Sequence, residues 1–244
     1  MRTGNPALNA KTFRVEYSDT NAMTIGGTVN KTAILLLMLA MTAIWSWKKV
    51  MTLGDISVMM PWMFGGMIVG LIFAIITIFK KTAAPYTAPV YALAQGVFLG
   101  ALSAMMEMSY PGIAFQAIAL TFGTLFALLS AYKSGLIMAT ENFKLGVVAA
   151  TGGIFLVYLA SFVMGLFGVS MPYIHGSGPL GIGFSVFVII IAALNLVLDF
   201  DFIEEGAKRG APRYMEWYAA FGLLVTLVWL YIEILRLLAK LRSR

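Results

Sequence analysis

Seven apolar segments constrain the fold of this 244-residue chain more than any other feature of its sequence. The chain is 60% hydrophobic and only 11% charged, which is more apolar surface than a soluble domain of this size can bury. Backbone polar groups in hydrocarbon must bond within their own segment, so these segments should be helices. We therefore predict an all-α integral membrane protein, a seven-helix bundle with spans near residues 33–47, 56–79, 88–106, 113–132, 145–167, 180–200 and 217–238.

The first 31 residues differ from the rest because they are polar and rich in Asn, Thr and Gly. This composition is typical of a flexible tail, so we predict a cytoplasmic tail over residues 1–31 and a transmembrane domain over residues 32–241. The first apolar segment is short for a span. It must begin a little before residue 33, or let Lys48 and Lys49 extend to the membrane surface.

Several classes of site are excluded or disfavoured by composition. The chain has no cysteine and a single histidine, His175, which excludes disulfides, thiolate metal sites and multi-His metal sites. No nucleophile and base can be assembled into a catalytic set, so we expect neither an enzyme nor a cofactor. The net charge of +6 comes from Lys and Arg beside the apolar segments, which indicates contact with the lipid bilayer and not with nucleic acid.

The basic residues also predict how the chain is oriented. With seven spans, the N-terminal tail and the connections on its side carry eleven Lys and Arg, against six on the opposite side. Four of those six lie in the C-terminal stretch from Arg236 to Arg244. Because cytoplasmic loops carry an excess of Lys and Arg, we predict a cytoplasmic N-terminus and a C-terminus outside.

Small residues predict close helix contacts in the second and third spans. Gly66 and Gly70 lie four residues apart, as do Gly96 and Gly100. This spacing lets two helix backbones approach closely.

The seventh span combines a strongly apolar sequence with an ionisable residue, Glu233. A charge at the centre of a bilayer costs about 2.5–3.5 kcal/mol on insertion scales, so such residues usually face the protein interior. Glu233, Arg236 and Lys240 share one face, which predicts that this helix is the most buried. Pro212 favours a helix start there, with residues 213–217 projecting into water.

Asp199, near the inner end of the sixth span, is the second acidic residue with apolar neighbours on both sides. Asp201 is its rival, but the two differ by about 200° around a helix, so only one can face the centre. For Glu233 a simpler interpretation is also open. It can pair with Arg236 three residues later, and the arginine can extend towards the membrane surface.

The residues around these carboxylates carry a family resemblance. The chain resembles the Bax inhibitor-1 (transmembrane Bax inhibitor motif) proteins, and its opening Thr3-Gly4-Asn5-Pro6-Ala7-Leu8 is similar to that of a bacterial branch. The stretch from Leu198 to Ile203 lies over a YDxxxI-like pattern, and Leu230 to Ile234 lies over an LYLDI-like pattern. The resemblance implies a central seventh helix, a bacterial inner-membrane location and a pH-sensitive calcium leak gated by two facing carboxylates.

Three departures from the family pattern bear on the site. The second carboxylate is Glu233 where the family has Asp, Phe200-Asp201 replaces Thr-Gln, and the connection between the carboxylates is longer. We assign Asp199 and Glu233 as the pH-sensing and gating pair, with Asp201 and Arg236 as contributors. Two such carboxylates cannot both ionise cheaply and would share a proton. Their oxygens would also form a weak Ca²⁺ site.

Three functions remain open at this point. The leading hypothesis is a proton-regulated cation (Ca²⁺) leak channel, with Ca²⁺ and protons as its ligands. The alternative is a non-conducting regulator that protects against stress by binding another membrane protein, such as a protease. A third is a secondary transporter that uses Asp199 as its proton carrier. Flux in purified vesicles separates the first two, because a regulator gives none.

The predicted orientation can be tested with reporter fusions. A reporter fused after Arg244 should be exported, and one placed before Lys31 should stay in the cytoplasm, because the basic residues hold the N-terminal side inside. A cytoplasmic C-terminal reporter would contradict a seven-span chain.

Overall fold

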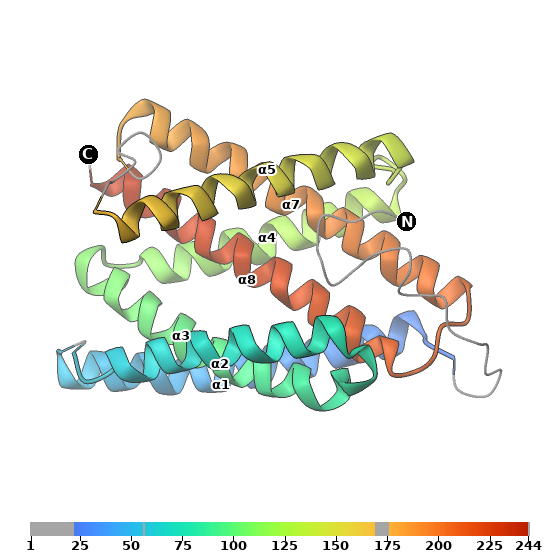
Figure 1. Cartoon of the computed structure of the whole chain (residues 1–244), viewed down its shortest axis with the longest axis horizontal. Helices are drawn as coiled ribbons and strands as arrows, with labels where there is room; N and C mark the ends of the chain where they lie inside the picture. The colour runs from blue at the N-terminus through green and yellow to red at the C-terminus, as the bar shows by residue number, and fades with distance from the viewer. Residues whose placement is uncertain (1–21, 56, 169–175, 244) are drawn as a thin grey trace. The chain divides into compact units, whose positions relative to one another are not determined.

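The computed structural model describes residues 22–55, 57–168 and 176–243, so most of the predicted tail and His175 lie outside the described residues. Within these ranges, seven helices are long and apolar enough to cross a membrane. They are α1 (Ile25–Leu53), α2 (Met60–Phe79), α3 (Ala84–Ser109), α4 (Ile113–Lys133), α5 (Glu141–Leu166), α7 (Pro179–Lys208) and α8 (Met215–Arg242), as Figure 1 shows. A single turn, η2 (Lys81–Ala83), precedes α3.

Each predicted span falls on one of these helices, which confirms the predicted all-α class with seven membrane-spanning helices. Helix α1 starts at Ile25, so its first two turns lie inside the segment predicted as tail. The reason is a local cap: Thr24 Oγ1 accepts a hydrogen bond of 2.8 Å from the backbone N–H of Gly27. The earlier start gives this first span the length that its apolar core lacks.

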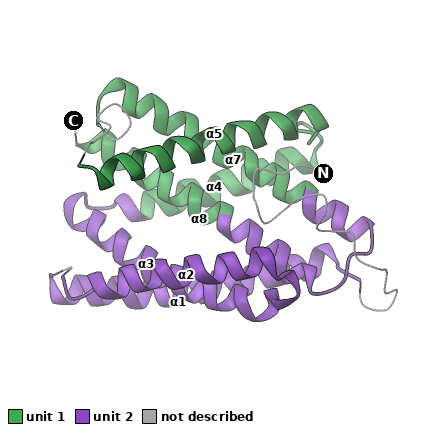
Figure 2. Cartoon of the chain, in the orientation of Figure 1, with its two compact units in different colours: residues 1–9, 115–201, 226–244 green, residues 10–114, 202–225 purple. Residues whose placement is uncertain are grey.

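The chain divides into two compact units, which Figure 2 shows in different colours. Unit 1 contains residues 1–9, 115–201 and 226–244, and unit 2 contains residues 10–114 and 202–225. Helices α4 and α5 belong to unit 1 almost entirely, and α1, α2 and α3 belong to unit 2. Helices α7 and α8 contribute to both, and the segments of these two helices that carry Asp199 and Glu233 belong to unit 1.

In unit 2, α3 packs against both α1 and α2 through small residues on α2 and α3. A Cβ atom at Gly96 would overlap the side chain of Thr42 and the carbonyl oxygen of Leu39, and one at Gly66 would lie 2.7 Å from the carbonyl oxygen of Ala94. The close approach lets Thr42 Oγ1 donate a hydrogen bond of 2.9 Å to the carbonyl oxygen of Leu93. The predicted small-residue contacts are therefore confirmed.

Helix α8 begins at Met215, three residues after the predicted start at Pro212. The chain around Pro212 is held in an extended conformation instead, because Ala22 and Pro212 form an isolated β-bridge. Glu216, predicted to project into water, is only 2% exposed. Its carboxylate accepts hydrogen bonds of 2.9 and 3.0 Å from the backbone N–H and hydroxyl of Thr24, and pairs with Lys31 at 2.6 Å. Arg213 is exposed, as predicted, but the predicted solvation was wrong for Met215 and Glu216, and the start of α1 covers Glu216.

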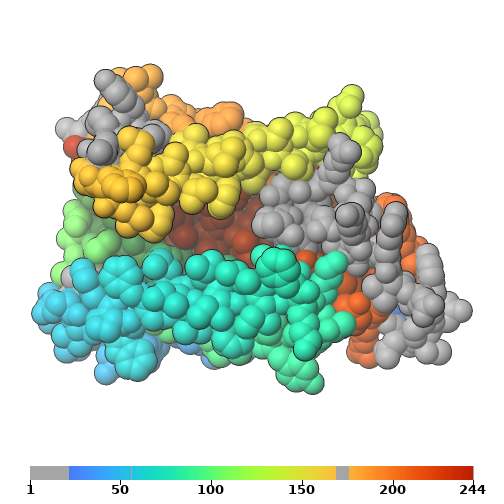
Figure 3. Space-filling view, viewed as in Figure 1, coloured from blue at the N-terminus to red at the C-terminus, as the bar shows by residue number. Residues whose placement is uncertain are grey.

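The helices differ strongly in how much of their surface is buried. In α8, 67% of the most apolar window is buried, against 11–44% in the other six described spans. The prediction that the seventh span is the most buried helix is therefore confirmed. Helices α2 and α5 expose large apolar side chains, and both helices are visible in Figure 3. Exposed apolar side chains of this kind suit contact with lipid.

The α1–α3 contact can be tested by adding one methyl group. Gly96→Ala should lower the stability of the purified protein by about 1–3 kcal/mol, because backbone atoms must move to make room. Gly123→Ala in α4 is the matched control, since a Cβ there meets nothing within 4 Å. Thermal unfolding in detergent measures both, and equal stabilities for the two variants would contradict the contact.

Candidate functional site

A stripe of polar residues at seven-residue spacing runs along one face of α5. Lys144, Thr151 and Tyr158 alternate on this face with the buried apolar residues Val147 and Ile154. A spacing of three and four residues keeps all five on one side of a helix. Each of the three polar residues bonds to a different residue of α7 or α8, so α5 connects to both acid-bearing helices.

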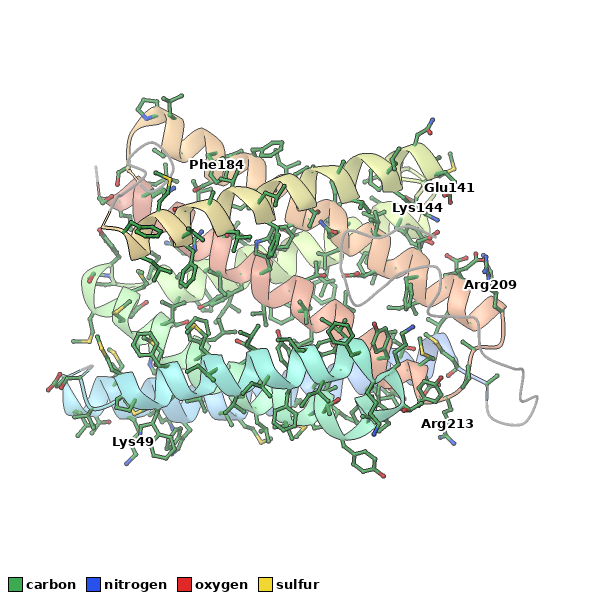
Figure 4. The ribbon with its side chains drawn as sticks, in the orientation of Figure 1. Lys49, Glu141, Lys144, Phe184, Arg209 and Arg213 are labelled. Atoms are coloured by element: carbon green, nitrogen blue, oxygen red, sulfur yellow. The ribbon has the colours of Figure 1, made fainter. Side chains whose placement is uncertain are left out.

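The first contact of the stripe is an ion pair between Lys144 and Asp201. Lys144 Nζ lies 2.7 Å from Asp201 Oδ2 and 3.5 Å from Glu141 Oε1, and the lysine is only 7% exposed. Glu141 and Lys144 lie close together at the start of α5, as Figure 4 shows. Asp201 is thereby occupied with Lys144, which separates its role from that of Asp199 two residues earlier.

The second contact joins Thr151 to Asn195 of α7. Asn195 Nδ2 donates hydrogen bonds of 2.8 Å to Thr151 Oγ1 and to the carbonyl oxygen of Ile191. Asn195 is 2% exposed, and no donor among the described residues reaches its Oδ1 atom. A buried acceptor without a partner costs about 1–3 kcal/mol, so this oxygen is a notable feature of the site.

The third contact is a triad of Tyr158, Glu233 and Arg236. The hydroxyl of Tyr158 donates a hydrogen bond of 2.9 Å to Glu233 Oε1, and Arg236 lies 3.1 Å from the same oxygen. The guanidinium also donates to the tyrosine hydroxyl at 3.0 Å and lies over its ring, 5.4 Å from the centroid. Glu233 is 1% exposed. The simpler interpretation of Glu233, pairing with Arg236, is therefore confirmed, and Tyr158 is an unexpected third member.

One further contact sets the register of α7 against α8. Lys240 Nζ donates hydrogen bonds of 3.0 Å to the carbonyl oxygen of Gly181 and 2.9 Å to Ser185 Oγ. The end of α8 therefore lies beside the start of α7, and the two helices are antiparallel. Lys240 is only 6% exposed.

This register places Asp199 and Glu233 at different levels. Glu233 lies seven residues before Lys240 on α8, whereas Asp199 lies fourteen residues after Ser185 on α7. At 1.5 Å per residue, these counts separate the two carboxylates by roughly 10 Å along the helix axes. The α5 stripe agrees, because Glu233 lies at Tyr158, and Asp199 lies between the residues bonded to Thr151 and Lys144.

The register differs from the predicted face-to-face pair, which needs the two carboxylates in contact to share a proton. The two residues are 34 positions apart, and the start of α8 was expected to absorb this length by projecting into water. It does not project, because Met215 and Glu216 are buried. Asp199 itself is fully buried, at 0% exposure, as expected for a residue with a role inside the protein.

No group of three or more His, Cys, Asp or Glu residues within the described ranges could hold a metal ion.

The Bax inhibitor 1-like family model matches residues 5–243, which is nearly the entire chain. The chain belongs to this family. No curated protein and no solved structure matches it. Membership makes this chain a multi-pass membrane protein of the regulator or channel-like kind, and the Bax inhibitor 1-like family is not a known family of enzymes.

Sequence reasoning missed four polar residues of this Bax inhibitor 1-like protein, namely Lys144, Thr151, Tyr158 and Asn195. One signal could have indicated three of them: the fifth apolar segment carries polar residues at a strict seven-residue spacing. A polar residue repeated on one face of a membrane helix indicates the face that packs against protein. Asn195 carries no such periodic signal.

The ion pair between Lys144 and Asp201 can be tested by neutralising the acid. Asp201→Asn should lower stability by about 1–3 kcal/mol, because a buried lysine loses its closer carboxylate. The matched control is Glu204→Gln, which breaks the more exposed pair with Lys208 and should change stability by less than about 1 kcal/mol. Equal losses in thermal unfolding would contradict the structural role of Lys144.

Proposed function

We propose that this protein is a proton-regulated cation leak that conducts Ca²⁺, with Asp199 and Glu233 as its two sensing and gating residues. The observation that carries the proposal is the burial of both carboxylates, at 0% and 1% exposure, in one unit of a membrane protein. Intramembrane acidic residues are costly and commonly belong to ion pathways or proton relays. Family membership supports the broader class to which such a leak belongs.

Asp199 is proposed as the residue that responds to protons. It lies in a buried segment of α7, and the competing carboxylate, Asp201, is engaged by Lys144. Protonation removes the charge of Asp199 and converts an acceptor into a donor, so the hydrogen bonds around it must change. A change of this kind can favour one of two helix arrangements, which is what gating requires.

Glu233 is proposed as a second cation-binding position on the same path. Its carboxylate is balanced by Arg236 and oriented by Tyr158. A cation that reaches this level would compete with the guanidinium for the carboxylate oxygens. The side chain of Arg236 is 38% exposed, so it has room to move aside while Tyr158 keeps Glu233 in place.

Ca²⁺ is the proposed ion because the site offers oxygen ligands. Carboxylate and amide oxygens suit a hard cation that prefers six to eight oxygen ligands. Few protein ligands make a weak site, and weak binding favours passage over storage. The proposed location is the bacterial inner membrane, with the N-terminus in the cytoplasm and the C-terminus outside.

The proposal predicts how flux depends on pH in two variants. Asp199→Asn and Glu233→Gln should each flatten the pH dependence of Ca²⁺ uptake into proteoliposomes, because each removes one titrating group and nearly keeps its shape. The fold-change in Ca²⁺ uptake in the double variant should equal the product of the two single-variant fold-changes to within about twofold, because sites more than about 7–10 Å apart act independently.

The matched control for these variants is Asp201→Asn, which should keep the wild-type pH profile once its stability loss is corrected. Wild-type vesicles that show no Ca²⁺ uptake at any pH would contradict the leak and favour a non-conducting regulator. A double variant no more affected than either single variant would instead show that the two carboxylates act as one unit.

A further inference from the structure

We propose that the last two turns of α1 bind the headgroup of an anionic phospholipid, such as phosphatidylglycerol. A hollow of about 240 Å³ lies on the exposed face of these turns, lined by Trp45, Lys48, Lys49, Thr52 and Leu53. The hollow belongs to unit 2, whereas Asp199 and Glu233 belong to unit 1, so this inference does not rest on the proposed leak.

The direction of this face is fixed by buried contacts elsewhere on the same two turns. Ser46 and Val50 are both 0% exposed. Ser46 Oγ donates a hydrogen bond of 2.9 Å to the carbonyl oxygen of Val97 on α3, and Val50 belongs to an apolar cluster with Met59 and Ala101. The lining residues are spaced three and four apart, which keeps them together on one side of the helix. That side faces outwards, and Figure 4 shows the lysine at position 49 directed away from the rest of unit 2.

The two lysines lie at the level of lipid headgroups. Apolar side chains stay exposed beyond them, with Met51 at 45% and Leu53 at 51%. Leu53 follows Lys49 by four residues, or about 6 Å along the helix. Each headgroup layer of a bilayer is roughly 5–8 Å thick. A helix that stays apolar to its end at Leu53 therefore ends within this layer, with the lysines at its inner boundary, beside the lipid phosphates.

Trp45 supports this level and forms one wall of the hollow. Its ring meets the ring of Trp62 on α2 edge to face, with centroids 6.0 Å apart and an angle of 78° between the planes. Both tryptophans are exposed. Exposed tryptophans gather at membrane–water interfaces, because the ring is apolar and its N–H group bonds to polar headgroups.

The charge of the hollow selects an anionic occupant. No ion pair among the described residues involves Lys48 or Lys49. The nearest acid along the chain, Asp55, accepts hydrogen bonds of 2.8 and 2.7 Å from the backbone N–H and hydroxyl of Ser57. Each ammonium group offers three donors, which phosphate oxygens can accept, and basic residues at the membrane surface attract anionic lipids. A second copy of α1 on this face is disfavoured, because it would bring four lysines together.

Native mass spectrometry of the full-length protein tests the site, using detergent micelles that contain either phosphatidylglycerol or phosphatidylcholine. The wild-type protein should bind phosphatidylglycerol at least about fivefold more tightly, because choline adds a cation that two lysines repel. Lys48→Gln with Lys49→Gln should weaken phosphatidylglycerol binding by about tenfold or more, since both ammonium groups are lost. Lys48→Arg with Lys49→Arg should stay within about threefold of wild type, because guanidinium groups also bind phosphate.

The matched control is Lys80→Gln with Lys81→Gln at the end of α2. It removes the same number of charges from unit 2 but none from the hollow. Phosphatidylglycerol binding should stay within about twofold of wild type. Lys48 and Lys49 are exposed, so their replacement leaves the core intact, and thermal unfolding of all variants checks this.

The outcomes separate a lipid site from general attraction and from a site for free anions. Equal losses of phosphatidylglycerol in the two double glutamine variants would overturn the site, and so would equal binding of the two lipids by the wild-type protein. Release of the bound lipid by millimolar inorganic phosphate would show a site for free phosphate and overturn the lipid assignment. None of these measurements requires Ca²⁺ flux, so the site and the leak can fail separately.

Discussion

The polar stripe of α5 is the constraint on which the arrangement of unit 1 depends. Lys144, Thr151 and Tyr158 each contact a different residue of α7 or α8, and seven-residue spacing keeps them on one face. The rest of α5 is largely exposed and apolar, as a lipid-facing helix should be. Hydrophobic contacts alone would leave α5 free to slide or rotate, because lipid is as apolar as the side chains it replaces. Three directional polar contacts fix its rotation and its register together.

This register determines what the acidic residues can do. Lys144 neutralises Asp201, and Tyr158 and Arg236 hold Glu233. The stripe positions Asp199 only indirectly, because Thr151 bonds to Asn195, one turn earlier on α7. Under the proposed function, Asp199 and Glu233 would then act in sequence along α7 and α8. Such an arrangement suits a path with successive weak cation-binding positions, which an ion can enter and leave. A single touching pair would act as a latch.

Much of the fold could be predicted from the sequence because membrane spans follow from composition. The seven helices, the small-residue contacts of Gly66 and Gly96, and the Glu233–Arg236 pair all depend on local spacing. The register of α7 against α8 could not be predicted, because it depends on Lys240 reaching Gly181 and Ser185, 55 or more residues away. Local sequence likewise carried no signal that the start of α1 would bury Glu216. Motif similarity predicted that Glu233 faces Asp199, and this stays a prediction, which the register given by Lys240 argues against.

Cysteine cross-linking tests the separation of the two carboxylates most directly, because the chain contains no cysteine of its own. A disulfide requires Cα atoms about 4.4–6.8 Å apart, so it reports contact and not mere proximity. The register of α7 against α8 predicts that Asp199→Cys with Glu233→Cys does not cross-link under mild oxidation. Efficient cross-linking between positions 199 and 233 would contradict the account and restore a face-to-face carboxylate pair.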